Sequence, residues 1–217
     1  HLWTQMQCLS RKADGLSEKQ IKSNFQEKTK MRVFSWEGDK DTVMSPWDSL
    51  RYYKHFLNTG MVSVEPQTGH IKVYVGGINY KHFKFDNAKL GRRQVGSTFK
   101  PFVYAAAMRD SELSPCYELE NSPVTFEDFD NWTPKNSNDA REGESVTLKW
   151  ALANSVNYIS AALIKDYTTP KAVVDLVKQM GITTPMEAYP SICLGTSDLS
   201  VMEMAGAMAT FANKGIH

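Results

Sequence analysis

The sequence has no long hydrophobic run and almost no excess charge of either sign. A membrane-spanning helix needs about 20 consecutive apolar residues, and no stretch approaches that length. No signal peptide is visible, so we expect membrane contact only through a segment outside this sequence. The formal net charge is +1, and no basic stripe with interleaved aromatic residues is present. We therefore expect no nucleic-acid partner.

Cysteine is also scarce, and nothing in its spacing is typical of a metal site. Only Cys8, Cys116 and Cys193 are present, and three cysteines cannot all pair within one chain. No C-x-x-C and no Cys/His spacing indicates metal ligation. The count is compatible with an extracytoplasmic location without requiring one.

The residues that are present predict several helices and one hairpin. A chain of 217 residues, 41% of them hydrophobic, is long enough for one large domain, or for one domain with a small attachment. Alternating valine and isoleucine residues on both sides of a Pro-Gln-Thr-Gly turn predict a hairpin over residues 61–77. Other patterns predict a strand at 31–36, an irregular segment at 111–146, and helices at 45–60, 147–167, 170–181 and 197–215. This is an α+β pattern whose sheet is incomplete.

Capping residues predict where two of these helices begin. Ser45 as N-cap with Pro46 in the first turn predicts one helix start, and Gly60 is its expected stop. For the last helix, Ser197 or Asp198 is the expected cap.

The segment QVGSTFKPFVY places a serine and a lysine on one face of a further helix. Ser97 and Lys100 are three residues apart, so they would be neighbours one turn apart in a helix. Pro101 is tolerated only near a helix start, which places that start close to Ser97. A hydroxyl at a helix N-terminus beside an amine suits a nucleophile. Alone, a surface serine with a solvated lysine is the commoner explanation of this spacing.

A second polar group interrupts the apolar helix predicted over 147–167. Asn154, Ser155 and Asn157 compete with helical hydrogen bonds, so a turn between two helices is expected there. Such a turn could present Ser155 and Asn157 to a cleft, although a local cap is the alternative. The chain contains a single Ser-x-Asn, which follows its single Ser-x-x-Lys.

Together these motifs resemble the serine acyltransferases that react with penicillin. The blocks EPQTGHIKVYVGG, RRQVGSTFKPFVYAAAM, WTPKNS, VTLKWALANSVN and LGTSDLSVMEMAGAMATFANKG are similar to the transpeptidase domain of class A penicillin-binding proteins. The resemblance covers residues 45–217, which would be the N-terminal and helical part of that domain. Residues 1–44 look like the linker region preceding it. The implied fold is the penicillin-binding transpeptidase (serine β-lactamase-like) fold, α+β with helices packed on an antiparallel sheet.

The sequence departs from the family in one respect, because it has neither Lys-Thr-Gly nor Lys-Ser-Gly. In the family this third motif lies beyond the FANKG block, so we expect it to be cut off rather than lost. The sequence would then be an excerpt from a longer protein, without the strand and the oxyanion-hole amide that accompany the motif. We expect the isolated chain to be weak or inactive. Its unpaired sheet edge would favour association with another chain that completes the sheet.

The resemblance assigns four catalytic residues. Ser97 would attack the penultimate D-Ala carbonyl of a D-Ala-D-Ala stem peptide, with Lys100 as its base. Ser155 would relay a proton to the leaving amine, and Asn157 would hold Lys100 and the substrate amide. Peptidoglycan stem peptides and β-lactam antibiotics would be the ligands, without metal or organic cofactor. The implied location is the periplasmic, extracytoplasmic face of the bacterial inner membrane.

Other residues and other functions remain open at this point. Trp132 and Asn136 match the W-x-P-x-N loop of the family, which would line the cleft and contact substrate, although a plain loop role is the alternative. Gly195 and Thr196 look like a turn that shapes the core. A D,D-carboxypeptidase or a serine β-lactamase would use the same nucleophile and pass the acyl group to water. A penicillin-sensing or scaffold module would keep the fold without turnover.

Overall fold

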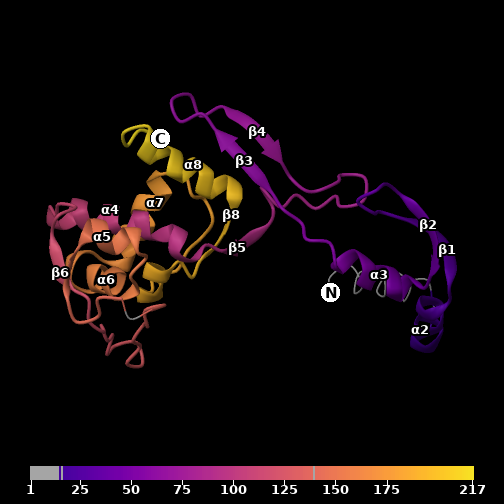
Figure 1. The fold of residues 1–217 in the computed structure, drawn as a ribbon, viewed down its shortest axis with the longest axis horizontal. Coiled ribbons are helices and arrows are strands. Elements are labelled where there is room, and N and C mark those ends of the chain that lie inside the picture. Colours follow the sequence, from indigo (N-terminus) through magenta and orange to yellow (C-terminus); the bar gives the residue numbers. More distant parts are fainter. Residues whose placement is uncertain (1–14, 16, 139) are drawn as a thin grey trace. The chain divides into compact units, whose positions relative to one another are not determined.

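The computed structural model describes residue 15, residues 17–138 and residues 140–217, and Cys8 lies outside these ranges. The chain divides into two compact units, one ending at Asn58 and the other running from Thr59 to His217. Figure 1 shows the elements of each unit. This division falls after residue 58, whereas the sequence suggested a domain start at residue 45. None of the described helices is long and apolar enough to cross a membrane.

The first unit combines two helices with a two-stranded antiparallel sheet. Its elements are α2 (Glu18–Gln26), β1 (Thr29–Val33), β2 (Lys40–Met44) and α3 (Pro46–Lys54). The register runs from the pair Thr29–Met44 to the pair Val33–Lys40. Helix α2 begins with a capping box, and Ile21 and Phe25 on its inner face are buried.

The predicted start of α3 is confirmed, and its predicted end is wrong. Ser45 accepts a hydrogen bond from the Asp48 amide, and Pro46 occupies the first turn. The helix ends at Lys54 rather than near Gly60. Gly60 instead permits a close approach of backbones, since a Cβ atom there would lie 2.7 Å from the Ala88 nitrogen.

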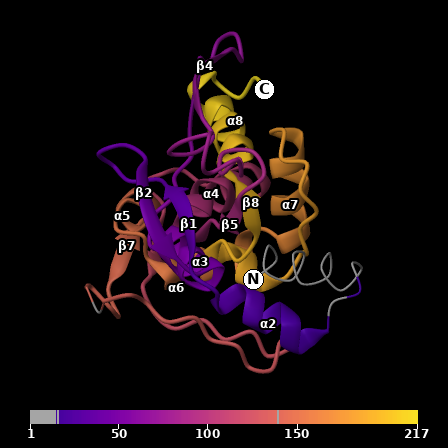
Figure 2. The same ribbon diagram turned by 90° about the vertical axis from the view of Figure 1, so that its right-hand side faces the viewer.

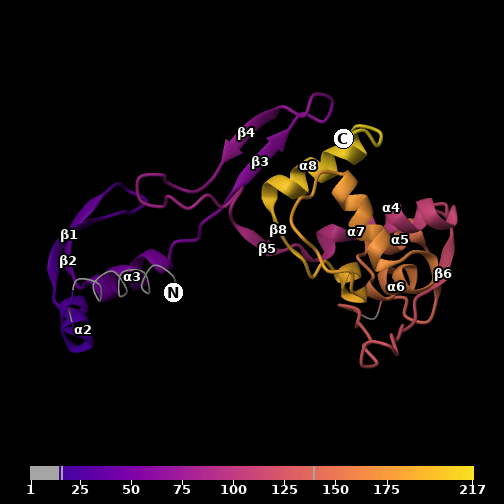
Figure 3. The same ribbon diagram turned by 180° about the vertical axis from the view of Figure 1, so that it is seen from behind.

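The predicted hairpin opens the second unit. β3 (Met61–Val64) pairs with β4 (Ile71–Val75) from Met61–Val75 to Val64–Ile71, with an irregularity between Ser63 and Val64. Helix α8 (Val201–Ala212) packs against β3, as the opposite views of Figures 1 and 3 show. Every residue of β4 is exposed. The part of the chain that the structure describes contains no third strand beside this pair.

The sequence missed most of the short strands. β5 (Arg92–Gln94) pairs with β8 (Asp198–Ser200), and β6 (Glu118–Glu120) pairs with β7 (Ser145–Thr147) inside the segment expected to be irregular. Three-residue strands carry too little alternation to be distinguished from loops. The α+β class is confirmed, with several small antiparallel sheets in place of one larger sheet.

Helices surround the core of the second unit. They are the 3₁₀ turn η1 (Gly96–Phe99), α4 (Lys100–Ser111), α5 (Leu148–Ala153), α6 (Asn157–Ala162), the π-helical turn η2 (Leu163–Tyr167), α7 (Pro170–Gln179), the 3₁₀ turn η3 (Pro190–Leu194) and α8. Helix α4 contacts α5, α6, α7, η2 and η3, and Figure 2 shows it between α5 and α7. Its central position explains why Phe102, Val103 and Ala106 are fully buried.

The start of α8 differs from the prediction. Ser200, not Ser197 or Asp198, is its N-cap, and a capping box joins Ser200 to Glu203. Asp198 is unable to cap the helix because it belongs to β8 and pairs with Gln94. The real capping signal, Ser-x-x-Glu, stood three residues further along the sequence.

Candidate active site

The predicted nucleophile lies at a helix start, as its local sequence requires. Gly96 has a φ of +56°, which a glycine adopts without strain, and η1 begins there. Ser97 is exposed in η1, and Pro101 occupies the first turn of α4. The described residues contribute no hydrogen-bond partner to the Ser97 hydroxyl. Lys100 follows one turn later and is only 1% exposed.

The Lys100 amine joins the two motifs that the sequence singled out. Its Nζ donates to the Ser155 carbonyl oxygen (2.5 Å), to Ser155 Oγ (3.1 Å) and to Asn157 Oδ1 (2.6 Å). An ammonium has three protons, so these three acceptors use its full donor capacity. The structure therefore brings together Lys100, Ser155 and Asn157, with Ser97 one helical turn away.

Ser155 occupies the turn between α5 and α6, as predicted. Its φ is +55°, in the left-handed region that glycine normally fills at a helix C-terminus. The Ser155 amide donates to the Leu152 carbonyl and the Val156 amide to the Ala151 carbonyl, which is the hydrogen-bond pattern of a Schellman motif. A serine there costs roughly 1 kcal/mol more than a glycine. Its hydroxyl, which reaches Lys100, is the group that a glycine would lack.

Asn157 is held on both sides of its amide. Its Nδ2 donates to the Lys135 carbonyl oxygen (2.7 Å), which leaves Oδ1 to accept from Lys100. Its backbone amide donates to Asn136 Oδ1 (2.9 Å). The side-chain carboxamide of Asn157 is thus oriented with its oxygen towards Lys100.

Burial makes Lys100 a weaker base than an ordinary lysine. Removal from water lowers the pKa of its ammonium to about 8, because no carboxylate among the described residues pairs with it. The buried thiol of Cys193 in η3 lies close enough to interact with this charge, and a thiolate there would raise the pKa of Lys100. Burial raises the pKa of the Cys193 thiol to about 12, so it stays neutral near pH 7.

The two residues expected to contact substrate have structural contacts. Asn136 Oδ1 also accepts from the Tyr158 amide (3.1 Å), and its Nδ2 donates to Asn121 Oδ1 (3.0 Å). Trp132 packs against Phe126 with ring centroids 5.4 Å apart, and the backbones of these two residues form an isolated bridge. A substrate contact of Trp132 or Asn136 stays a prediction.

Gly195 lies directly against Gly96, the residue that precedes Ser97. Its φ is +69°, and a Cβ atom on it would overlap the carbonyl oxygen of Gly96. The Gly96 amide donates to the Gly195 carbonyl oxygen (2.9 Å). These two glycines allow η3 to lie directly against η1.

The sequence missed three buried groups near the candidate site. Asn121 is fully buried and holds Asn136, and Cys193 lies near Lys100. Tyr104, one turn after Lys100 on α4, has a buried hydroxyl that interacts with the Ser160 side chain without reaching standard hydrogen-bond geometry. Cys193 and Tyr104 carry no sequence signal, whereas Asn121 is a polar residue beside a short strand in a segment rich in turn residues.

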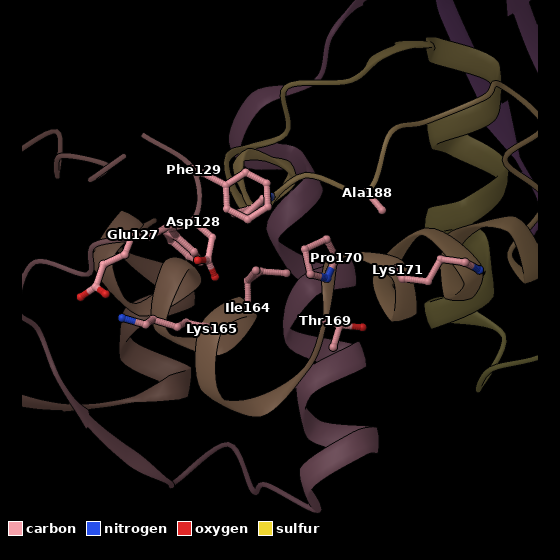
Figure 4. Close-up of a pocket in the computed structure, with 11 residues that line it drawn as sticks. Glu127, Asp128, Phe129, Ile164, Lys165, Thr169, Pro170, Lys171 and Ala188 are labelled. Carbon is pink, nitrogen blue, oxygen red and sulfur yellow. The ribbon is translucent and has the colours of Figure 1, made fainter. Parts of the chain in front are cut away.

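The pocket shown in Figure 4 is a separate hollow of about 470 Å³. Phe129, Ile164, Pro170 and Ala188 line it together with charged residues of both signs. None of the four predicted catalytic residues lines it. The cluster around Lys100, not this pocket, is therefore the candidate active site.

Comparisons with known proteins agree with the geometry. The penicillin-binding protein transpeptidase domain matches residues 59–217, and the penicillin-binding protein middle domain matches residues 5–57. Penicillin-binding protein 1A of Aquifex aeolicus is 33% identical over 73% of this chain, and that of Pseudomonas aeruginosa is 31% identical over 82%. The chain spans 22% of the length of each of these relatives.

Solved structures give the same result for the fold. The crystal structure of penicillin-binding protein 1A from Haemophilus influenzae matches with a TM-score of 0.66 at 32% identity, covering 72% of this chain and 23% of that one. The transpeptidase domain of Burkholderia pseudomallei penicillin-binding protein 3 matches with a TM-score of 0.59, covering 77% of this chain and 54% of that one. Its identity is 14%, so this second match supports the fold alone.

Proposed function

The chain belongs to the penicillin-binding protein transpeptidase family, and from this premise we propose that it is part of a serine D,D-transpeptidase that cross-links peptidoglycan. The observation that carries the proposal is the set of three hydrogen bonds from Lys100 Nζ to Ser155 and Asn157. They join the Ser-x-x-Lys helix start to the Ser-x-Asn turn, although 55 and 57 residues separate the partners in the chain.

The proposed reaction begins at Ser97. Its Oγ attacks the penultimate D-Ala carbonyl of a stem peptide, while its proton passes to the neutral amine of Lys100. The peptide bond to the terminal D-Ala then breaks, and the leaving amine receives a proton from Lys100 through the Ser155 hydroxyl. An amine of a neighbouring strand then attacks the acyl-enzyme carbonyl and gives up a proton to Lys100. The ester bond to Ser97 breaks as the cross-link forms, and Lys100 returns the proton to Ser97 Oγ. A serine hydroxyl needs such a base because it is a weak nucleophile on its own.

Burial supplies part of the tuning that this role requires. A lysine with a pKa of about 8 is neutral in roughly one molecule in ten at pH 7, whereas an unperturbed lysine is neutral in fewer than one in a thousand. The gain in neutral amine is about two orders of magnitude. The third-motif lysine of the family would be a further positive group that lowers this pKa.

A β-lactam would acylate Ser97 in the same way, and the slow loss of the acyl group would make the protein an antibiotic target. A D,D-carboxypeptidase or a serine β-lactamase would instead pass the acyl group to water, and a scaffold would not be acylated. We place the reaction on the extracytoplasmic side of the membrane, where peptidoglycan is assembled.

Fluorescent penicillin labelling, read by intact mass, tests the proposal. It is applied to the 217-residue chain, to a version extended through a Lys-Thr-Gly motif, and to Ser97→Ala in the extended version. We expect one label on the extended version and none on Ser97→Ala. We expect little label on the short chain, since loss of one oxyanion-hole donor costs roughly 10²–10³ in rate.

Two results would overturn the proposal. An extended version that is folded but unlabelled would favour the scaffold. Label that disappears within minutes, with release of hydrolysed penicillin, would favour the β-lactamase.

A further inference from the structure

Three side-chain amides connect the buried residue Asn121 to Lys100 in the candidate site. Asn121, which follows β6, accepts a hydrogen bond from the Asn136 side chain. Asn136 in turn accepts from the backbone amide of Asn157, and the Asn157 side chain accepts from Lys100. The heavy-atom distances along this path are 3.0, 2.9 and 2.6 Å. Every step is short enough to be an ordinary or charge-assisted hydrogen bond.

Asn121 is anchored so that only its oxygen faces Asn136. Its Nδ2 donates to the carbonyl oxygens of Ala140 (3.1 Å) and Arg141 (3.0 Å), which uses both of its side-chain protons. Its backbone amide donates to the Glu144 carbonyl, and its own carbonyl accepts from the Gly143 amide, both at 2.9 Å. The residue is fully buried, with 0% of its surface exposed. Neither its side chain nor its backbone is free to rotate.

This anchor fixes the orientation of Asn136. Since Asn121 Oδ1 accepts from Asn136 Nδ2, Asn136 Oδ1 must point the other way. It accepts there from the amides of Asn157 (2.9 Å) and Tyr158 (3.1 Å). These are the first two amides of α6, whose own N-cap, Val156, has no side-chain oxygen. Asn136 therefore caps α6 from outside the helix.

The segment that contains Asn136 also fixes the Asn157 side chain by a hydrogen bond. The carbonyl oxygen of Lys135, next to Asn136, accepts from Asn157 Nδ2 at 2.7 Å. If the Asn157 amide flipped, its NH₂ group would face the Lys100 amine, and Lys100 would lose an acceptor. The position of residues 135 and 136 thus decides which atom of Asn157 meets Lys100.

We propose that Asn121 and Asn136 are positioning residues for Lys100, which act through Asn157 and do not themselves contact substrate. This inference rests on the proposed function, in which Lys100 is the base. It differs from the cleft-wall role expected for Asn136, because Asn136 Oδ1 accepts from two backbone amides and one Nδ2 proton is donated to Asn121, so these groups serve the protein's own structure. It also assigns a role to Asn121, which no sequence motif indicated.

A double-mutant cycle tests the path. The second-order rate constant of penicillin acylation, resolved into the affinity of the initial complex and the acylation step, is measured for Asn121→Ala, Asn157→Ala and the double variant. All are made in the version extended through the third motif. We expect Asn121→Ala to slow the acylation step about tenfold with little change in the initial affinity. In the Asn157→Ala background the same substitution should cost no more than about twofold.

A merely structural role for Asn121 predicts a different result. It would slow acylation by the same factor in both backgrounds, and that outcome would overturn the inference. Asn138→Ala is the matched control, because this exposed carboxamide in the same loop has the Ala140 amide as its single hydrogen-bond partner among the residues that the structure describes. Its rate should stay within twofold of the unmutated protein.

Three further measurements keep the test decisive. Thermal unfolding of every variant identifies any that fails to fold. Because Asn121 is fully buried, a second cycle with the half-buried Asn136 (Asn136→Ala) gives the same comparison if Asn121→Ala does not fold. Label at Ser97 of the unmutated protein reports on the proposed function separately. If Ser97 is labelled but Asn121→Ala slows acylation by the same factor in both backgrounds, the positioning role of Asn121 and Asn136 is rejected and the proposed function stands.

Discussion

Lys100 and Glu203 are ionisable side chains of the same compact unit, and neutral groups surround each of them. Lys100 has three acceptors, yet burial lowers its pKa to about 8, so its charged form is disfavoured. Partial burial by itself raises the pKa of Glu203, but hydrogen bonds from Thr184 and Ser200 outweigh it and hold the pKa at about 2. The charged form of Glu203 is therefore favoured.

The number of donors around Glu203 explains this difference. Its Oε1 accepts from the amides of Thr183 (3.2 Å) and Thr184 (2.8 Å) and from both threonine hydroxyls. Its Oε2 accepts from the amide of Ser200 (3.2 Å) and its hydroxyl (3.0 Å). The carboxylate thereby fastens the start of α8 to the segment after α7. Hydrogen bonds thus stabilise the charged form of Glu203, which connects two segments of the fold, whereas burial destabilises the charged form of Lys100, as the proposed role of a general base requires.

Removal of the Lys100 amine should have the largest effect. In the version extended through the third motif, Lys100→Ala should slow acylation of Ser97 by roughly 10²–10⁴-fold, the usual contribution of a general base. Stopped-flow labelling with fluorescent penicillin measures the rate. Lys171→Ala is the control, since that exposed lysine pairs with Asp175 on α7. A rate near that of the unmutated protein would assign the base to another group.

Removal of the Glu203 charge should affect stability instead of chemistry. Glu203→Gln places an NH₂ group against hydrogen-bond donors, which should cost about 2 kcal/mol of the free energy of unfolding. Chemical denaturation measures this loss. Glu142→Gln, at an exposed carboxylate, should change the stability by less than about 0.5 kcal/mol. Equal stability of the two variants would show that the donors around Glu203 contribute nothing.

The same carboxylate predicts a response to acid. Because the folded pKa of about 2 lies below the usual value of 4.5, Glu203 stabilises the fold above pH 4.5. This contribution is lost as the pH falls from 4.5 through 2. Denaturation midpoints of the unmutated protein and Glu203→Gln, measured from pH 7 down to pH 2, should converge. Parallel curves would contradict this prediction.

The pH dependence of acylation should be smaller, about tenfold between pH 7 and pH 9. Lys100 is protonated below its pKa and neutral above it, so the rate should rise with pH and reach half of its maximum near pH 8 in the 217-residue chain, and at a lower pH where the third-motif lysine is present. Cys193→Ala should leave this midpoint almost unchanged, because the buried thiol is neutral over the whole range. A midpoint near pH 10 would mean that burial does not tune the lysine.

The smallest effect is expected at a charge pair in water. Lys171 and Asp175 pair across one turn of α7, and both side chains are exposed. Asp175→Asn should lower the free energy of unfolding by about 0.3–0.5 kcal/mol, with no change in acylation. A loss above 1 kcal/mol would mean that exposed pairs on this surface rival the Glu203 contacts.

Much of the local structure could be predicted because its causes are local. The start of α3, the β3–β4 hairpin and the break at Ser155 follow from caps, alternation and polar residues that lie within a few positions of each other. The errors have an equally physical origin. Strands of three residues have no detectable period, and Asp198 looked like a cap although its pairing with Gln94 excluded that role.

The sequence alone determined the family and the α+β class, since these depend on motifs and patterns within short stretches, and the resemblance to the family assigned the four residues expected to act. Only the tertiary structure decided what surrounds them. Contacts between residues far apart in the chain bring Lys100 to the Ser155 turn, bury it near a neutral Cys193, and link it through two asparagines to Asn121. Burial and amide orientation depend on how separate segments pack, and neither is encoded by any single stretch of residues.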